Sequence, residues 1–244
     1  IMQKPRFVKQ LEHRARRSRF QLLTHLLRPL QRPIRILDVG GEFGFWEILD
    51  YTQLGEIHVT LLNLFPQDRL PQNFYSRVGD ARSMQAYGTD DFDVVTSNSA
   101  IGHVGSFQDQ MSMANEIRRI GKRYFVQTPN QYFPVDWRTL IPLFHFLPLN
   151  ARARLLHSLP ITSFGRIKPY SSALNWASSV RNLTHSELRV LFPEATITRE
   201  RVLGFTKSFM VTHGFDSSAV LTAKQEDLTR RSTERRGARS AVYS

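Results

Sequence analysis

The pattern of apolar and polar residues along the chain alternates between two kinds of segment. Short apolar runs typical of buried parallel strands occur at 34–39, 57–64, 74–80, 92–99 and 122–129. Segments with apolar residues near helical spacing occur at 6–28, 45–54, 111–120 and 184–193. This alternation predicts a parallel sheet with right-handed crossovers and helices on both faces.

The alternation stops after the fifth predicted strand. Residues 130–180 are rich in aromatic residues and prolines, which is typical of an inserted cap. A Thr184–Glu187 capping box marks the start of the next helix. The segments 196–203 and 205–213 are then expected to close the sheet as an antiparallel pair. We therefore predict an α/β fold with a Rossmann-like, mostly parallel, seven-stranded sheet and an aromatic-rich cap insertion after strand five.

The 244-residue chain divides into three predicted parts. Residues 1–33 form a basic, amphipathic N-terminal helix, and residues 34–215 form the main domain, with the cap insertion at about 130–180. Residues 216–244 form a basic tail that is rich in Arg, Ser and Thr and poor in apolar residues, and we predict that it is disordered.

The positive charge lies mainly at the two ends of the chain. The formal net charge is +12, and residues 1–35 hold ten Lys or Arg and one Glu, a net +9. Residues 36–223 hold 17 basic and 17 acidic residues and are neutral. A neutral central domain favours a small-molecule or lipid-linked substrate over a nucleic acid, and the basic N-terminal helix suits packing on the fold or contact with an anionic membrane surface.

Several classes of site are excluded by composition. The chain contains no cysteine, so it has no disulfides, thiolate metal sites or cysteine nucleophiles. No apolar run approaches the roughly 18 residues of a membrane span, and no apolar signal region follows the basic N-terminus. We expect a cytoplasmic protein, with peripheral membrane association as an open alternative.

Polar residues follow four consecutive predicted strands. The first strand ends in Asp38, Gly40 and Gly41, the second in Asn63, the third in Asp80, and the fourth in Ser97 and Asn98. Ligands of open parallel sheets bind beyond the carboxyl ends of the strands, and glycines there let the backbone approach the ligand. Taken alone, the glycines could equally shape an ordinary turn, but four polar strand ends together predict a ligand site.

The ordered series "ILDVGGEFGFWE", "VTLLNLF", "VGDA", "FDVVTSNSAIGHV" and "RRIGKRYFVQTPN" resembles the class I S-adenosylmethionine-dependent methyltransferases of the methyltransferase-domain 11 branch. The resemblance covers about residues 34–130, with a weaker one at 184–213. It implies S-adenosylmethionine as the cofactor. It also implies cofactor-binding roles for residues after the first four strands: Asp38, Gly40, Gly41, Asn63, Leu64, Asp80, Ala81, Ser97 and Asn98.

The chain departs from the family pattern at three places. Glu42 stands where the middle glycine of the loop is usual, and Asn63 stands where an acid usually contacts the ribose. Some related O-methyltransferases have a Glu-x-x-Glu-His metal motif where this chain has "SAIGH", so only His103 remains of that motif. We therefore predict no metal. His103 is a candidate general base, although a loop histidine that bonds the backbone is the commoner role.

The segment after the fifth strand is where the acceptor is expected. Asn130, Tyr132, Phe133 and Trp137 are the candidate substrate residues, since aromatic side chains suit an apolar acceptor. The sequence thus predicts a methyltransferase acting on an oxygen of a small-molecule or lipid-linked acceptor. Two alternatives stay open, an RNA methyltransferase and a degenerate S-adenosylmethionine-binding protein without catalysis.

Overall fold

The computed structural model describes residues 19–47, 51–136, 138–162, 165–202 and 204–216. The predicted basic tail after its first residue and the first 18 residues of the predicted N-terminal helix lie outside these ranges, as does Trp137. All structural statements below refer to the described residues.

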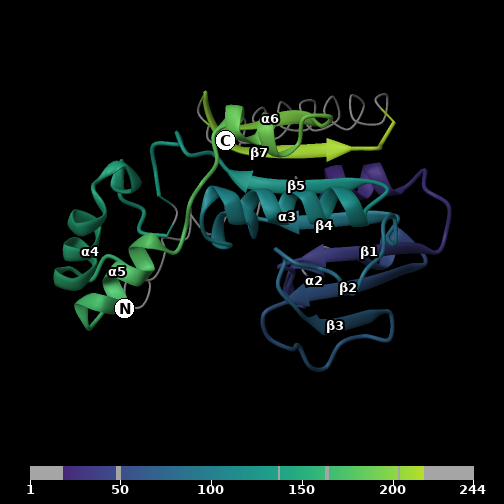
Figure 1. Ribbon diagram of the computed structural model, residues 1–244, viewed down its shortest axis with the longest axis horizontal. Helices are drawn as coiled ribbons and strands as arrows, with labels where there is room; N and C mark the ends of the chain where they lie inside the picture. The colour runs from purple at the N-terminus through teal and green to yellow at the C-terminus, as the bar shows by residue number, and fades with distance from the viewer. Residues whose placement is uncertain (1–18, 48–50, 137, 163–164, 203, 217–244) are drawn as a thin grey trace, which may run out of the picture.

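In the described part of the chain, seven strands form one sheet with the order β3-β2-β1-β4-β5-β7-β6 (Figure 1). The strands are β1 (Ile34–Val39), β2 (Ile57–Asn63), β3 (Phe74–Val78), β4 (Val94–Asn98), β5 (Tyr124–Pro129), β6 (Thr196–Val202) and β7 (Phe205–His213). The first five are parallel, and β7 pairs antiparallel with both β5 and β6. The strand order reverses between β1 and β4, so the carboxyl ends of these two strands flank the switch point of the sheet.

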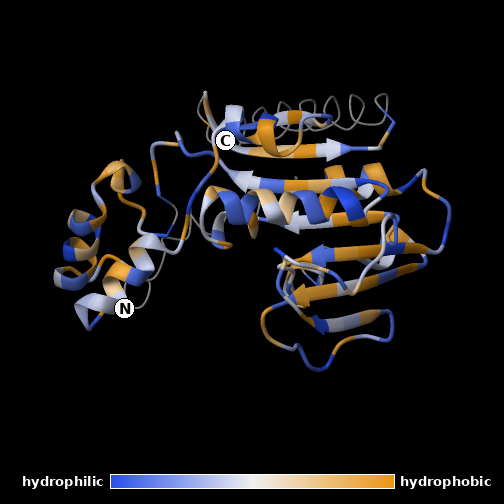
Figure 2. Cartoon of the chain, in the orientation of Figure 1, coloured by the Kyte–Doolittle hydropathy of each residue, from blue (hydrophilic) through white to orange (hydrophobic). Residues whose placement is uncertain are grey.

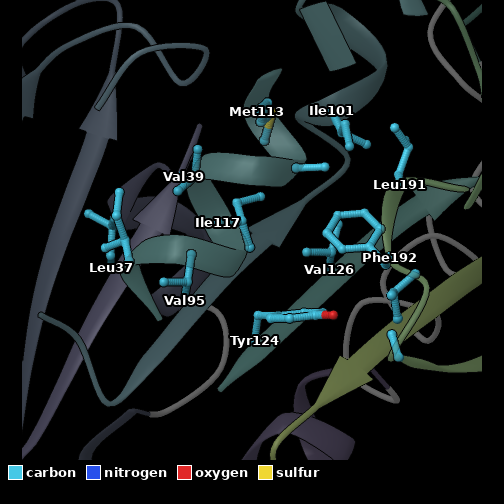
Figure 3. Close-up of a cluster of buried hydrophobic side chains, with 14 of the residues drawn as sticks. Leu37, Val39, Val95, Ile101, Met113, Ile117, Tyr124, Val126, Leu191 and Phe192 are labelled. Atoms are coloured by element: carbon cyan, nitrogen blue, oxygen red, sulfur yellow. The ribbon is translucent and has the colours of Figure 1, made fainter. Parts of the chain in front are cut away.

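Helices cover both faces of the sheet. On one face, α3 (Phe107–Ile120) and α6 (His185–Leu191) bury Met113, Ile117 and Leu188 against the strands. Figure 3 shows this cluster, in which Tyr124 and Phe192 lie close together among aliphatic side chains. On the other face, the helical residues 19–27 and the short helix α2 (Phe43–Glu47) pack on the sheet.

Residues 130–180 form a separate lobe, which we call the cap lobe. It contains a 3-10 turn (Phe144–Phe146), α4 (Leu149–Ser158) and α5 (Tyr170–Ser178). Its two helices pack around a small core of their own, made of Phe144, Ala153, Leu156, Ala173 and Ala177. Figure 1 shows the lobe to the left of the sheet, on the side to which the arrowheads of the parallel strands point. The cap lobe therefore lies beyond the carboxyl edge of the parallel strands.

The predicted seven-stranded, mostly parallel sheet with helices on both faces is confirmed, and the differences lie in element boundaries. The expected helix at 45–54 is instead α2 followed by a 3-10 helix (Tyr51–Leu54). Helix α3 starts at Phe107, four residues before its predicted start, because Ser106 and Asp109 form a capping box. Strand β4 starts at Val94, two residues after its predicted start, because Phe92 forms only an isolated bridge to Gly121. None of the described helices has both the length and the apolar character needed to cross a bilayer.

Candidate active site

The turn after β1 depends on two glycines for its shape. Gly40 has φ +73°, in the left-handed region that favours glycine, and a Cβ there would lie 2.3 Å from the Cβ of Ala100. A Cβ on Gly41 would lie 2.1 Å from the Oδ2 atom of Asp38. A side chain at either position would collide with neighbouring protein atoms, so both positions require glycine. Gly40 is exposed, so its backbone still reaches the carboxyl edge.

Asp38 is buried, and both of its carboxylate oxygens already have protein partners. The indole N–H of Trp46 donates to Oδ2 at 2.8 Å, and the hydroxyl of Thr96 donates to Oδ1 at 3.0 Å. Burial raises the pKa of Asp38 to about 6, although these two hydrogen bonds act in the opposite direction. We expected this carboxylate to point toward a ligand, but it faces Trp46 and Thr96 and holds β1, α2 and β4 together.

The carbonyl of Gly41 is held by two side-chain amides. Asn63 donates to it at 3.2 Å, and Gln67 donates to it at 2.9 Å. The other end of the Gln67 amide accepts from the backbone N–H of Phe43 at 2.9 Å. Side chains from β2 and from the loop that follows it thus hold the glycine turn in place. The amide of Asn63 is already hydrogen-bonded to the protein.

The residues after Asn63 expose apolar side chains at this edge. Leu64 is 74% exposed and Phe65 is 52% exposed. The backbone N–H of Leu64 donates to the Oδ1 atom of Asn63 at 2.8 Å. An exposed leucine next to the strand end offers an apolar contact to a ligand at this edge.

Asp80 lies beside Asn63, because the backbone N–H of Gly79 donates to the Asn63 carbonyl at 2.9 Å. Arg82 holds the carboxylate of Asp80 with its backbone N–H, its Nε and its Nη2, the last at 2.6 Å. The Nη1 atom of Arg82 donates to Asp109 on α3 at 3.0 Å. The hydrogen bonds from Arg82 lower the pKa of Asp80, so it is ionised at neutral pH. Ala81 is partly buried against the core.

The two candidates at the end of β4 have different surroundings. Ser97 is buried, and its hydroxyl donates to the Val39 carbonyl at 3.0 Å. Asn98 is partly exposed, and its Oδ1 atom accepts from Arg19 at 3.0 Å. Arg19 also lies 3.8 Å from Glu200 on β6. The N-terminal helical segment therefore reaches the carboxyl edge of the sheet through Arg19.

His103 ends a 3-10 helix (Ile101–His103) that directly follows β4. Its side chain is exposed, but nearby groups displace part of its hydration, and the positive charge of Arg138 in the cap lobe adds to this effect. Both effects lower the pKa of His103, so the ring is neutral at pH 7. The preceding Gly102 accepts from the backbone N–H of Arg181 at 2.8 Å. His103 therefore lies between the sheet edge and the cap lobe.

The predicted acceptor residues do not share one environment. The side-chain amide of Asn130 donates to the Thr206 carbonyl at 2.8 Å and so holds the chain after β5 against β7. Tyr132 is 66% exposed at the exit from β5, whereas Phe133 is buried. Trp137 lies outside the described residues. Of this predicted group, Tyr132 alone combines a described position with an exposed side chain.

The carboxyl edge brings together three different groups that a ligand could contact. Gly40 supplies accessible backbone, Leu64 an exposed apolar side chain, and Asp80 an ionised carboxylate. Asp38 and Ser97 lie beneath this edge and support it. Within the described ranges, no cluster of three or more His, Asp or Glu side chains is arranged to hold a metal ion.

Three supporting residues were not predicted from the sequence, namely Arg19, Gln67 and Arg82. Arg82 follows Asp80 by two residues, a spacing at which an aspartate often bonds the backbone ahead of it, so a local signal existed. Gln67 and Arg19 act over 26 and 79 residues respectively. No local pattern in the sequence indicates contacts of that range.

A family described as "Methyltransferase domain" matches residues 10–188 of the chain. No curated protein sequence matches it. A crystal structure of a possible exported protein from Bordetella parapertussis has 15% sequence identity and a TM-score of 0.51, covering 82% of this chain and 66% of that chain. At this identity the likeness concerns the fold.

Two further solved structures are similar at lower TM-scores. A SAM-dependent methyltransferase from Aquifex aeolicus has 13% identity and a TM-score of 0.46, covering 86% of this chain and 98% of that one. The 1,6-didemethyltoxoflavin-N1-methyltransferase from Burkholderia thailandensis, solved with S-adenosylhomocysteine, has 14% identity and a TM-score of 0.48, covering 80% and 77%.

The family match extends over most of the chain and includes the strand ends described above. It agrees with the strand order and with the glycine turn at the switch point. The chain belongs to the methyltransferase-domain family and is a class I enzyme that uses S-adenosylmethionine as its cofactor.

Proposed function

We propose that the enzyme methylates an oxygen atom of a small-molecule or lipid-linked acceptor, with His103 as the general base. The observation that carries this proposal is the position of a neutral, solvent-reaching histidine between the strand ends and the cap lobe. Hydroxyl groups need a base because they are weak nucleophiles when protonated.

The cofactor would lie along the ends of β1, β2 and β3. The turn at Gly40 and Gly41 would admit its amino-acid part, the end of β2 would meet the ribose, and Leu64 and Asp80 would contact the adenine. When bound, S-adenosylmethionine supplies an electrophilic methyl group on a sulfonium. The protein's own task is then to hold the acceptor oxygen in line with that group and to exclude water, and such positioning can account for much of a methyltransferase's acceleration.

His103 supplies the proton transfer in this scheme. Its Nδ1 or Nε2 lone pair would accept the proton of the acceptor hydroxyl as the oxygen attacks the methyl group. The lowered pKa keeps the ring unprotonated at neutral pH, so the lone pair is available. Activity is accordingly expected to fall only as the pH drops below the ordinary histidine value of about 6.5.

The acceptor side of the site favours an apolar compound. Tyr132 is exposed where the chain leaves β5, and the cap lobe that follows exposes further apolar side chains. Apolar and aromatic side chains with a few polar groups are typical of sites for small organic molecules.

Labelled methyl transfer tests this function directly. The full chain is incubated with methyl-labelled S-adenosylmethionine and with the lipid, small polar and RNA fractions of a cell extract in turn. Label in the lipid or small-molecule fraction that is present as a methyl ether or a methyl ester supports the proposal. Label mainly in RNA would replace it with an RNA methyltransferase, and cofactor binding without transfer to any fraction would indicate a binding protein that has lost catalysis.

A further inference from the structure

The cap lobe carries a charge pattern that the rest of the main domain does not share. Residues 130–180 contain five Lys or Arg and one acid, Asp136, a net +4. The surrounding range 36–223 is neutral overall, so its remaining residues carry a net −4. Positive charge in the main domain is therefore concentrated in the segment that builds the cap lobe.

Two of these five cations have partners within the lobe. Arg138 lies 4.3 Å above the ring of Trp176 and 3.3 Å from the carboxylate of Asp136, and Arg152 donates to a backbone carbonyl of α5. The other three are exposed, and the one acid of the lobe already pairs with Arg138; they are Arg154, Arg166 and Lys168.

Large apolar side chains are exposed on the same lobe. They are Leu143 (57%), Phe146 (47%), Leu147 (38%), Leu149 (37%), Leu159 (45%) and Tyr170 (37%). Figure 2 shows the turn before α4 in the hydrophobic colour. The lobe buries other apolar side chains in its own core, so these residues are not exposed for lack of a core. Four of them, Leu143, Phe146, Leu147 and Leu149, come from one stretch, 143–149, and exposed apolar side chains gathered in this way are typical of interaction surfaces.

One of these exposed residues, Leu143, has a backbone conformation that is unfavourable for leucine. Leu143 has φ 60° and ψ 8°, in the left-handed region that leucine rarely adopts. Its N–H donates to the Pro134 carbonyl at 2.7 Å, and its carbonyl accepts from Phe146 at 3.0 Å. Both the backbone conformation and the exposed side chain are unfavourable in water, and a surface that receives Leu143 would offset the second cost.

We propose that the cap lobe docks on an anionic lipid bilayer. Leu143, Phe146 and Leu147 would enter the headgroup region, and the exposed cations would attract the lipid phosphates. Nucleic acid would use the cations but has no need of exposed aliphatic side chains. A second copy that docked lobe to lobe would bring two positively charged lobes together, which charge repulsion opposes. A bilayer accommodates both features.

The position of the lobe gives this docking a consequence for the enzyme. The lobe lies beyond the carboxyl edge, where the cofactor and acceptor are expected (Figure 1). A bilayer that touches the lobe would bring lipid-linked acceptors close to that edge. The consequence depends on the proposed function, but the docking itself does not, since binding to vesicles requires neither cofactor nor methyl transfer.

The first test uses the full chain in vesicle sedimentation, with phosphatidylcholine vesicles that do or do not contain phosphatidylglycerol. We expect binding to the anionic vesicles and an about tenfold loss in Leu143→Asn, because a buried leucine side chain is lost. Asparagine tolerates the left-handed conformation, so the variant should unfold in urea at or above the wild-type midpoint. Val190→Asn, at an exposed position of α6, is the control and should bind like the wild type.

The second test addresses charge. Each cation near an anionic membrane is worth about a factor of five in partition, so Arg154→Gln with Arg166→Gln should weaken binding about 25-fold. The matched control replaces Arg28 and Arg201, two exposed arginines outside the lobe, and should lose much less.

Several results would overturn the proposal. They are no binding to anionic vesicles, equal losses in the lobe and control variants, and a Leu143→Asn effect on self-association instead of vesicle binding. Binding to RNA but not to vesicles, with a steep salt dependence, would assign the lobe to nucleic acid and would equally overturn it. Methyl transfer to a water-soluble acceptor without vesicle binding would reject the docking surface while keeping the enzyme.

Discussion

Replacing Asp38 with asparagine is expected to stabilise the fold more at pH 8 than at pH 5. Burial raises the pKa of Asp38 from 3.8 to about 6. A carboxyl group whose pKa is raised by folding stabilises the protein when protonated, and this contribution is lost as the pH rises through the folded-state value. Above pH 6 the wild type therefore contains a buried charge that the asparagine variant lacks.

The size of the effect follows from the two pKa values. Between pH 5 and pH 8 the titration of Asp38 lowers the free energy of unfolding by about 1.4 kcal/mol, or about 3–6 °C in the midpoint of a chain this long. Asparagine can keep both contacts, because its oxygen can accept from Trp46 and its amide can donate to the Thr96 hydroxyl. The pH dependence therefore isolates the charge from the packing.

Urea unfolding followed by tryptophan fluorescence at both pH values measures the difference. The control is Asp93→Asn at the amino end of β4. Partial burial opposes the shift there, but bonds from the Arg35 backbone and the Lys122 ammonium leave the pKa of Asp93 lowered, so it is ionised at pH 5 and pH 8 alike. The free energy of unfolding of Asp38→Asn relative to the wild type should rise by about 1.4 kcal/mol from pH 5 to pH 8. If it is as independent of pH as that of Asp93→Asn, Asp38 is not a buried, pKa-shifted acid and our description of the turn fails.

Three further predictions concern the strand ends. Asp80→Ala should weaken S-adenosylhomocysteine binding about tenfold or more in calorimetry, whereas Asp93→Ala, which removes a paired carboxylate from the opposite edge, should leave it unchanged; equal binding by both variants would remove Asp80 from the site. His103→Gln should lower turnover about 10²–10⁴-fold with little change in cofactor affinity and should abolish the acid limb of the pH–rate profile, whereas His58→Gln should match the wild type in both; a His103→Gln enzyme with near-normal turnover would return that residue to a structural role. Asn63→Asp should lower stability in urea by about 1 kcal/mol, because a carboxylate would replace the amide that lies 3.2 Å from the Gly41 carbonyl; tighter cofactor binding at unchanged stability would show that the turn is held differently.

The order and type of the core elements could be predicted because their signals are local. The apolar run 34–39 followed by glycines needed only neighbouring residues to be interpreted, and β1 occupies that range. The same holds for Thr184 and Glu187, whose capping box opens α6 as expected. Boundaries were less accurate where a capping residue had not been considered, as at Ser106 before α3.

The direction of polar side chains at the strand ends could not be predicted in this way. Asp38 ends a strand at the expected edge, yet Trp46, eight residues later, turns its carboxylate inward. Asn63 was interpreted from its position after β2, but its amide bonds a backbone carbonyl 22 residues earlier. Such pairings depend on how separate elements pack, and hydrophobic periodicity carries no information on them.

Hydrogen exchange of the full chain, measured with and without S-adenosylmethionine, tests most directly whether the cofactor binds where the strand ends converge. We predict saturable slowing of exchange in peptides that contain the turn at Gly40 and Gly41, Leu64 after β2, and Ala81 after β3. Peptides from the amino edge, such as the one containing Glu56, should exchange at the same rate in both conditions. Unchanged exchange throughout, or slowing confined to peptides away from these strand ends, would contradict the assignment.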